Sequence, residues 1–597
     1  MPDPADTDRD DPEAPDQLPP WRLEGALLVP FLNGIEHVGI LRERYHDAEV
    51  VPATIRVEAL RSDAGEIEHA SPFAAVELAP GPGNRERVAS LAARLAEAGL
   101  DVSIRDDETA MLWDKLSFLS PLALVTTHAG APAGAVRTER REDALAVIHE
   151  VAAVAHAAGA GVDEAAVVEL LDGVPEQMES SMQRDAAAGR PIELDAIGGA
   201  VLRAANAAGV AAPVTAPRRR AARARAGDPM RIETVGVELV SLAMARPMQT
   251  AIHRVDRTEN VLVEICADGL VGQGAALTLA ANQARAVACM VDDLVDGLVG
   301  QDATNVGGHW ERLWARLNFS GQSGIGVLAL SAIDTALWDL LARAAGMPLY
   351  RLLGGVHEEL PVYTQGGWLS YSSEELVEEA LGFEERGFRH YKMRAGSADW
   401  RADVERIERV RAALGDGTEL LVDANQGWST ATALAAARAL DGLGLYWLEE
   451  PVDVGNVEGS ARVAAATTTP ISAGETVFGT AGFSPLIERR AADVLMPDLQ
   501  HCGGPTGFMR VAEQAALANL PISSHLFTEV SVHLLMACPN ALIVEHMPGW
   551  WDDLFDGGPQ IVDGSIRPSQ EPGLGCRFAE RARGSLTART TPPTEVH

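Results

Sequence analysis

The sequence predicts an α/β protein in which a (β/α)8 barrel follows a mainly helical amino-terminal region. Eight β-rich runs, each ending in a polar residue, recur at intervals of 20 to 31 residues through 355–550. Alanine-rich amphipathic segments separate most of these runs, and alanine-rich segments of helical period also fill much of the first 215 residues. Eight repeated strand–helix units are the number that closes a barrel.

Length and charge restrict the classes of function. With 597 residues, the chain should hold about three or four globular units at about 100 to 200 residues each. Its formal net charge of -36 disfavours nucleic acid as a partner, because such a field repels phosphate backbones. No uninterrupted apolar run has the length of a membrane span, and the first twenty residues lack the pattern of a secretion signal. We therefore expect a cytoplasmic protein with no membrane partner.

The first half of the chain divides by composition. Residues 1–20 are rich in acids and prolines and are predicted to form a disordered tail. Residues 21–215 begin with a short α/β piece and continue as helices. Five arginines lie between a Pro and a Gly-Asp-Pro in 216–229, which we interpret as an exposed linker. A second fold should then begin at Met230.

Cysteine and lysine usage add two expectations. The five cysteines are an odd number, lie far apart and form no CxxC pair, which argues against a disulfide framework and a zinc cluster. Only two of the 49 basic residues are lysines, Lys115 and Lys392. Lysine can lose its proton when buried, whereas arginine holds its proton, so both lysines are candidates for acid/base chemistry. The alternative is that they survived by chance.

The polar strand ends of the predicted barrel carry the candidate site. In chain order they are Tyr363, Lys392, Asp423, Glu449, Glu475, Asp498, His525 and Glu545. Chemistry in such barrels is built at the carboxyl ends of the strands. Asp423, Glu449 and Glu475 end consecutive strands, so their carboxylates should converge and require a divalent cation, for which an all-oxygen site suits Mg²⁺.

Asp498 and His525 end two further neighbouring strands. A carboxylate on the neighbouring strand can orient an imidazole and raise its basicity, which would make His525 a general base. The alternative is that the three acids are unrelated solvated strand ends and His525 is an ordinary core histidine.

Residues 230–580 resemble the mandelate racemase group of the enolase superfamily. The matching motifs are AIDTALWDLLARAAGMPLYRLLGG, YKMR, VDANQ, LEEP, AGET, MPDLQHCGG, SSHLFTEVSVHLL and IVEH. The resemblance implies an α+β capping domain in 230–354, the barrel in 355–550, a segment 551–580 that returns to the cap, and a flexible tail in 581–597. It also implies a symmetric homo-oligomer that acts on a small-molecule carboxylate.

The resemblance also assigns roles within the site. It makes Asp423, Glu449 and Glu475 the ligands of Mg²⁺, and the Asp498–His525 pair the base. Lys392 and a protonated Glu545 would stabilise the enediolate that forms when the α-proton of a 2-hydroxy carboxylate is removed. Gln365 and Asn425 would contact the substrate.

One position departs from the family pattern. Racemases of this group carry Lys-x-Lys, whose second lysine is the base on the face opposite histidine, but this chain has Lys392-Met393-Arg394. Arg394 is a poor base because a guanidinium holds its proton tightly. A racemase or epimerase is the first interpretation, with Arg394 or water serving the second face. Dehydration of an acid sugar by the His–Asp pair alone is the alternative.

The positions that line the racemase pocket are apolar here and favour an apolar or aromatic 2-hydroxy acid, because a polyhydroxy acid would need hydrogen-bonding partners. The alternative is that these side chains pack the cap onto the barrel and do not contact a substrate. They are Met248, Ile252, Val255, Leu277, Leu279, Phe319, Leu526 and Met547.

Residues 21–215 resemble a ketopantoate reductase without its first part. The motifs are FLNGIEH, ETAMLWDKLSFLS, SSMQRDAAAGRPIELDAIGGAV and GVAAPVTA. The resemblance implies Lys115 as the general acid and Asn33, Ser181 and Glu193 as substrate or cofactor contacts.

Two features disfavour reductase activity in this region. The sequence contains no G-x-G-x-x-G turn to cradle a pyrophosphate, so NADPH is not expected to bind this chain alone. Leu119 and Ala123 also replace family asparagines. The region is therefore interpreted as a packing module or fusion remnant, or else as a partial 2-dehydropantoate reductase completed by another chain.

Overall fold

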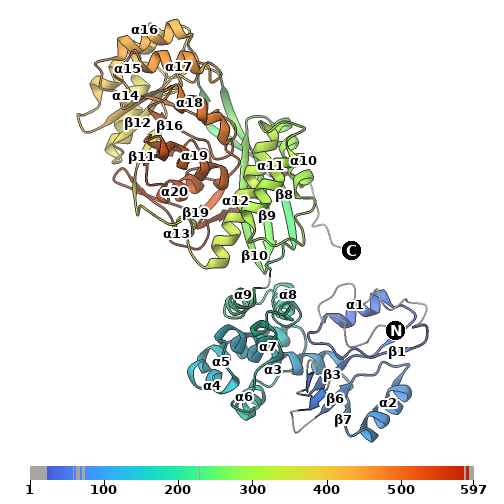
Figure 1. Cartoon of the computed structure of the whole chain (residues 1–597). Helices are drawn as coiled ribbons and strands as arrows, with labels where there is room; N and C mark the ends of the chain where they lie inside the picture. Colours follow the sequence, from blue (N-terminus) through green and yellow to red (C-terminus); the bar gives the residue numbers. More distant parts are fainter. Residues whose placement is uncertain are drawn as a thin grey trace. The chain divides into compact units, whose positions relative to one another are not determined.

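The computed structural model describes residues 23–57, 59–61, 67–69, 74–227, 229–583 and 586–589. The chain divides into two compact units, Met1–Pro229 and Met230–His597, which are described one at a time (Figure 1). The predicted tail 1–20 lies outside the described residues.

The larger unit contains the predicted barrel of eight parallel strands. Each strand pairs with the next in the chain, and pairing of the first strand with the second and the last closes the ring. The strands are β11 (Leu360–Gln365), β12 (His390–Arg394), β13 (Glu419–Asp423), β14 (Trp447–Glu449), β15 (Ile471–Ala473), β16 (Val494–Leu495), β17 (Ile522–Ser523) and β18 (Ala541–His546). The (β/α)8 prediction is confirmed.

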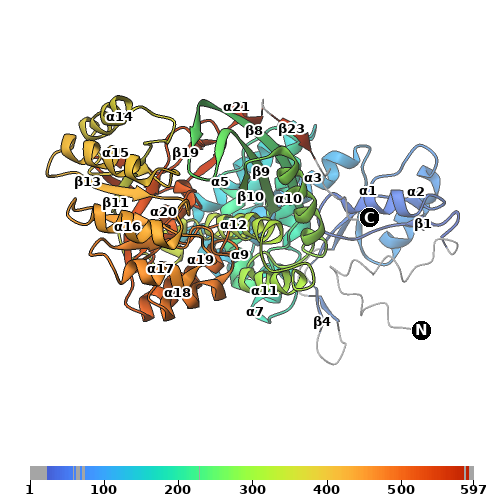
Figure 2. The same ribbon diagram turned by 90° about the horizontal axis from the view of Figure 1, so that it is seen from above.

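Helices lie around the outside of this ring (Figure 2). They are α14 (Ser373–Glu385), α15 (Trp400–Ala413), α16 (Thr430–Leu440), α17 (Val457–Ala464), α18 (Ser484–Glu488), α19 (Pro505–Leu517) and α20 (Thr528–Met536). In α15 the buried residues Val404, Ile407 and Val410 are three apart, so one face of the helix packs on the barrel. Inside the ring, Tyr363 and Trp447 meet edge to face with ring centroids 5.5 Å apart.

The cap is an antiparallel sheet covered by helices. Its strands are β8 (Thr234–Gln249), β9 (Arg254–Ala267), β10 (Leu270–Thr278) and β23 (Leu586–Arg589), and its helices are α10 (Ala281–Val295), α11 (Val306–Arg316), α12 (Ile325–Ala345) and α13 (Leu349–Leu352). Helix α12 lies directly on β10, where a Cβ at Gly272 or Gly274 would come within 2.1 Å of a helix carbonyl oxygen. Only glycine permits this approach.

Two expectations from composition can be compared with the structure. All five cysteines are free thiols. Among the described residues, one helix, Ile325–Ala345, has the length and apolar composition to cross a membrane, and 78% of its most apolar window is buried inside the fold. This helix is the core helix α12 of the cap.

The C-terminal segment contacts both the cap and the barrel. It contains β19 (Phe555–Gly557), β20 (Gln560–Val562), β21 (Ser565–Arg567), β22 (Cys576–Phe578) and α21 (Glu580–Arg583). Strand β21 pairs with barrel strand β11, and the Phe578 amide donates to Gln273 of the cap (3.0 Å). The prediction of a flexible tail from 581 is wrong for Leu586–Arg589, because these residues add a strand to the exposed edge of β8.

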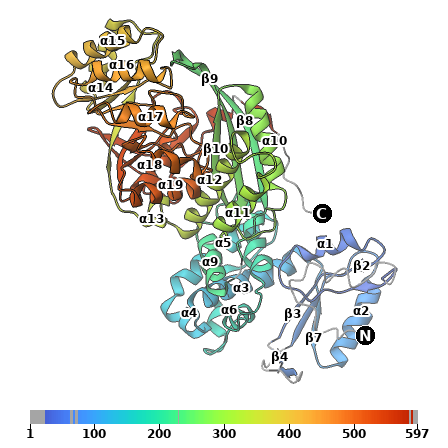
Figure 3. The same ribbon diagram turned by 45° about the horizontal axis from the view of Figure 1, so that its top comes forward.

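The hairpin between β8 and β9 reaches the carboxyl ends of the barrel strands (Figure 3). Its tip residue Ala251 packs so closely on Gly396 and Gly427, which follow β12 and β13, that a Cβ at either glycine would lie 2.8 Å from the Ala251 methyl. The Leu369 amide donates to the Gln249 carbonyl at 3.0 Å. The cap therefore covers the barrel mouth.

The smaller unit has an α/β part and a helical part, as expected. The first part contains β1 (Leu27–Leu28), α1 (His37–Arg44), β2 (Glu49–Val50), β3 (Ala53–Arg56), β4 (Ala59–Arg61), β5 (Ile67–His69), β6 (Ala75–Leu78), α2 (Arg85–Glu97) and β7 (Asp101–Ile104). The second part contains α3 (Glu108–Ala129), α4 (Ala133–Glu139), α5 (Arg141–Ala157), α6 (Glu164–Gly173), α7 (Ser181–Ala187), a π-helical turn (Asp195–Gly199), α8 (Ala200–Ala208) and α9 (Thr215–Ala226).

Helix α9 corrects the expectation of an exposed linker in 216–229. Ala222 is completely buried, and Arg219 is only 2% exposed while it pairs with Asp195 (2.9 Å). The segment contains only arginine and alanine from 218 to 226, so it can form a helix with a buried alanine and a buried guanidinium paired with an acid.

Burial of His533 predicts a pH-dependent stability. This side chain on α20 hydrogen-bonds the Leu574 carbonyl (3.0 Å) and the Tyr350 amide (3.3 Å), and burial lowers its pKa to about 4. A lowered histidine pKa contributes stability above pH 6.5 that is lost as the pH falls towards 4. We expect the difference in unfolding free energy between wild type and His533→Gln to shrink by about 3 kcal/mol from pH 7 to pH 4. Denaturant titrations of both proteins at each pH measure this difference. A difference in unfolding free energy that does not change with pH would refute the prediction.

Candidate active site

The barrel brings the predicted site residues to one mouth. Each residue lies between two positions before and three positions after the carboxyl end of its strand, because successive parallel strands end on the same rim. The residues that meet there are Gln365, Lys392, Arg394, Asp423, Asn425, Glu449, Glu475, Asp498, His525 and Glu545.

Asp423, Glu449 and Glu475 form a buried carboxylate trio. One oxygen from each lies within 4.8 Å of the others. The Trp447 indole donates to Glu449 Oε2 (2.9 Å), and the Asn425 amide group donates to Asp423 Oδ2 (2.9 Å). These bonds fix the orientation of two of the three carboxylates.

The trio fits a divalent cation. Three hard oxygen donors converge at a buried position, and Glu475 Oε2 is buried without a hydrogen-bond partner among the described residues. Burial raises the pKa of Glu449 to about 7, because the cations nearby offset only part of the cost of its charge. Such a group gains most from an additional positive charge.

Lys392 and Glu545 form a fully buried ion pair. The Lys392 ammonium donates to Glu545 Oε1 (2.8 Å) and to Glu449 Oε1 (2.9 Å). Although burial raises the pKa of Glu545, Lys392, His525 and the Leu526 amide outweigh it and lower that pKa to about 2. The Lys392 ammonium beside it favours the ionised carboxylate of Glu545, whereas the protonated form was expected from the sequence.

His525 and Asp498 form the expected pair. His525 Nδ1 lies 2.7 Å from Asp498 Oδ2, whose other oxygen accepts from the Gln500 amide (2.7 Å). The second ring nitrogen, Nε2, lies 3.5 Å from Glu475 Oε2. Burial lowers the His525 pKa, but Glu475, Asp498 and Glu545 outweigh it and raise the value to about 10. A cation that neutralised Glu475 would remove the largest of these influences.

Arg394 is held on both sides at the other end of the trio. Its two terminal nitrogens donate to Asp423 and Gln365, and its guanidinium carbon lies 5.1 Å from the centre of the Trp368 ring. The side chain is 5% exposed. Trp368 was not predicted from the sequence, since the loop after β11 carries no motif that marks it.

The predicted apolar pocket positions fall into two groups. Val255, Leu277, Leu526 and Met547 are buried in the main hydrophobic core, with Met248 and Leu279 packed against it. Ile252 is half exposed and Phe319 fully exposed. The structure therefore places six of the eight in one apolar layer between cap and barrel, and leaves Ile252 and Phe319 apart from it.

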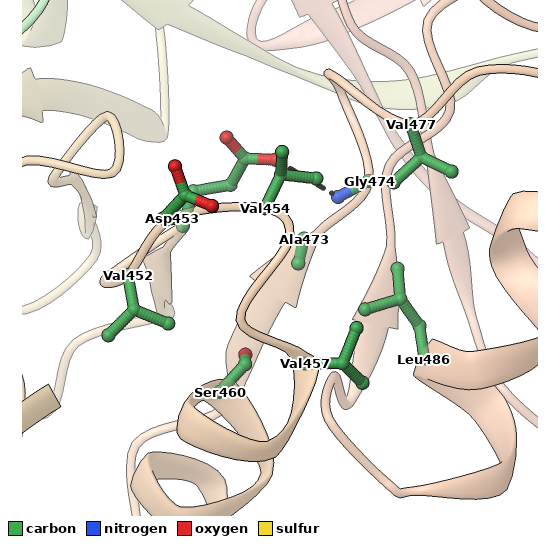
Figure 4. A pocket seen from close by; sticks show the side chains of 10 residues that line it. Val452, Asp453, Val454, Val457, Ser460, Ala473, Gly474, Val477 and Leu486 are labelled. Carbon is green, nitrogen blue, oxygen red and sulfur yellow. Dashed lines mark hydrogen bonds between the residues drawn. The ribbon is translucent and has the colours of Figure 1, made fainter.

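Glu450 is a buried acid at the mouth that sequence reasoning left without a role. It accepts hydrogen bonds from Gln426 (2.7 Å) and Thr476 (3.2 Å), and burial raises its pKa to about 8. Behind it lies a cavity of about 10 Å³, with Val457, Val477 and Leu486 around it (Figure 4). This space is too small for a substrate.

In the smaller unit, Asn33 donates to Glu193 (2.6 Å), so two of the residues predicted as substrate or cofactor contacts lie together. Burial and the neighbouring charge of Lys115 lower the pKa of His37 to about 4, so Lys115 lies close to this site. Ser181 begins α7, but its neighbour Ser180 makes the contacts, capping the helix through Gln183 and meeting Thr126 at 2.9 Å.

Comparison with known families agrees with this geometry. Residues 233–354 match the model of the mandelate racemase / muconate lactonizing enzyme N-terminal domain, and residues 375–582 match the enolase C-terminal domain-like model. Residues 107–217 match the ketopantoate reductase C-terminal model. The chain belongs to the enolase superfamily, and it is an enzyme of that superfamily joined to a ketopantoate reductase-like region.

Several similar proteins are sugar-acid dehydratases or cycloisomerases, and one is an L-Ala-D/L-Glu epimerase. The L-talarate/galactarate dehydratase of Salmonella typhimurium is 33% identical over 60% of this chain and 92% of its own length. The 3,6-anhydro-α-L-galactonate cycloisomerase of Streptomyces coelicolor is 36% identical over 52% of this chain and 85% of its own. A crystal structure of the Salmonella enzyme with Mg and L-lyxarohydroxamate is 31% identical, with a TM-score of 0.59 over 61% of this chain and 95% of that one.

Proposed function

We propose that the barrel catalyses Mg²⁺-dependent dehydration of an acid sugar, with His525 as its only base. The observation that carries this proposal is the asymmetry of the mouth. A histidine oriented by Asp498 lies at one end of the carboxylate trio, and a guanidinium fixed by Asp423 and Gln365 lies at the other. Mg²⁺ bound by the trio would act as a Lewis acid towards the substrate carboxylate and make its α-proton more acidic.

The chain's own residues account for the remaining steps. His525 Nε2 accepts the α-proton, and Asp498 stabilises the imidazolium that forms. The electron pair of the C2–H bond becomes the C2–C3 double bond while the C3–O bond breaks. His525 returns its proton to the leaving hydroxyl, which departs as water. The enol then becomes a 2-keto-3-deoxy acid. Lys392 stabilises the negative charge that develops on the substrate carboxylate.

Racemisation of an apolar 2-hydroxy acid is the second candidate. The apolar layer that contains Val255, Leu277, Leu526 and Met547 favours it. Racemisation, however, needs a proton donor and acceptor on both faces of the α-carbon, and arginine is too weak an acid to exchange its proton in turnover. The two candidate functions therefore differ in whether a proton is exchanged on the second face of the substrate α-carbon.

A product assay separates the two candidates. The protein with Mg²⁺ is incubated with galactarate, galactonate, xylonate and arabinonate, and separately with mandelate, and 2-keto acid is trapped with semicarbazide. We expect keto acid from at least one acid sugar and no racemisation of mandelate. Racemisation of mandelate without keto acid from any sugar would replace the proposal by the second candidate.

For the smaller unit we propose a packing role rather than reduction. The sequence offers no glycine-rich turn for a pyrophosphate. Leu119 packs against the helical core and Ala123 lies within it, at the two positions where polar groups were expected.

A further inference from the structure

Arg394 has one hydrogen-bond donor left over. Its terminal nitrogens are committed to Asp423 and Gln365, whereas Nε is buried without a hydrogen-bond partner among the described residues. The side chain is 95% buried, so water does not easily compensate this donor. A buried, unpaired donor costs free energy unless something arrives to accept from it.

Asn425 has the complementary deficit. Its amide nitrogen donates to Asp423 (2.9 Å), but its side-chain oxygen is buried and accepts no hydrogen bond from the described residues. Arg394 and Asn425 thus flank the same carboxylate, one with a free donor and the other with a free acceptor. A hydroxyl group can accept from the first and donate to the second.

The loop after β11 keeps the guanidinium in place. Trp368 covers one face of the guanidinium, and the Gly367 carbonyl accepts from the Arg394 amide (3.1 Å). Glu379 holds the same loop by accepting from the Gly367 amide and the Tyr391 hydroxyl, both at 2.7 Å. The free Nε–H therefore points in a fixed direction.

The donor lies on the far side of the trio from the base. Arg394 touches Asp423, the first carboxylate of the trio, whereas His525 lies 3.5 Å from Glu475, the last. On the barrel rim, Arg394 ends the second strand and His525 follows the seventh. A substrate held at the trio with its α-proton towards His525 would present its other substituents to Arg394.

We propose that Arg394 is a specificity-determining residue that selects hydroxylated acids, its Nε–H donating to a substrate hydroxyl oxygen beyond the carboxylate. Trp368 acts as a positioning residue for this guanidinium. The inference rests on the proposed function in placing the substrate at the trio. It deepens that function, since it names the group that would discriminate between hydroxylated and apolar acids. Sites built to hydrogen-bond a hydroxyl reject ligands without one.

Binding to an inactive form of the full chain tests this. In a His525→Asn background with saturating Mg²⁺, calorimetry gives the Kd of galactarate, galactonate and mandelate, the last having no hydroxyl beyond C2. Arg394→Lys keeps the positive charge but removes the fixed Nε–H. We expect this change to weaken binding of at least one sugar acid by about tenfold or more and of mandelate by less than about twofold.

Arg406→Lys is the matched control. Arg406 donates to the main-chain carbonyls of Arg394 (3.3 Å) and Trp368 (3.1 Å), so its replacement disturbs the same loop without removing the donor. It should leave the ratio of sugar-acid to mandelate affinity within about twofold of the parent. Trp368→Leu should lower the ratio of sugar-acid to mandelate affinity, but by less than Arg394→Lys does. Equal weakening of both ligands by Arg394→Lys, or no binding of either sugar acid, would overturn the inference.

The same data separate this inference from the proposed function. Selective weakening of a sugar acid in the binding assay, without keto acid from the wild-type protein, would overturn dehydration and leave the role of Arg394 standing. Release of keto acid by the wild-type protein, without selective weakening of sugar-acid binding in Arg394→Lys, would overturn the role of Arg394 and leave dehydration standing.

Discussion

Replacing Glu475 by Gln should abolish turnover and Mg²⁺ binding together. The substitution keeps the volume of the side chain but removes one of three converging negative charges, at a carboxylate with one oxygen that has no hydrogen-bond partner among the described residues. If the cation supplies about 4 kcal/mol to the transition state, activity should fall about 10³-fold. Steady-state rates and Mg²⁺ titrations by calorimetry measure the two effects.

Glu450→Gln is the matched control for that change. Glu450 is adjacent to Glu449, equally buried and acidic, but its carboxyl bonds Gln426 and Thr476 outside the trio. Burial raises the pKa of Glu450, which favours its neutral form, and an amide has nearly the same shape as a neutral carboxyl group. Mg²⁺ affinity should stay within about threefold of wild type. Normal Mg²⁺ affinity in Glu475→Gln would show that the trio is not the metal site.

His525→Asn should remove proton transfer while leaving the metal site intact. Loss of a general base costs about 10²- to 10⁴-fold, and we expect the α-proton exchange rate to fall by that amount. Mg²⁺ affinity should not weaken, because His525 Nε2 lies 3.5 Å from Glu475 and is outside the trio. Exchange is measured by NMR in D₂O at fixed Mg²⁺.

Two comparisons complete this test. Asp498→Asn should lower exchange less, because the imidazole remains but loses the carboxylate that orients it at 2.7 Å. His357→Asn, at the opposite end of the barrel, where the imidazole bonds the Cys538 carbonyl (3.1 Å), should leave the rate unchanged. Undiminished exchange in His525→Asn would mean that another group is the base.

The sequence predicted the barrel and its metal trio because both follow from spacing. Strands that end on one rim bring Asp423, Glu449 and Glu475 together whatever the helices between them contain. His525 and Asp498 were predictable for the same reason. These predictions depend on strand order rather than on side-chain detail.

The contacts of individual side chains were harder to predict from the sequence than the strand order. The ion pair of Glu545 with Lys392 depends on the two side chains lying 2.8 Å apart, and the position of Trp368 over Arg394 depends on how one loop folds. Helix α9 was mistaken for a linker because its arginines suggested exposure, although the Arg219 side chain is buried and pairs with the exposed Asp195. Neither charge state nor pairing can be inferred from composition alone.

The stereochemistry of α-proton exchange tests the central claim most directly. The wild-type protein with Mg²⁺ is incubated in D₂O with each enantiomer of mandelate and with the acid sugars, and the α-proton and the keto acid are followed together by NMR. A site with His525 as its one base should exchange the α-proton of only one configuration and release a 2-keto-3-deoxy acid that carries deuterium at C3. Exchange of both mandelate enantiomers with racemisation would show that a second base acts from the Arg394 side, and would contradict the account.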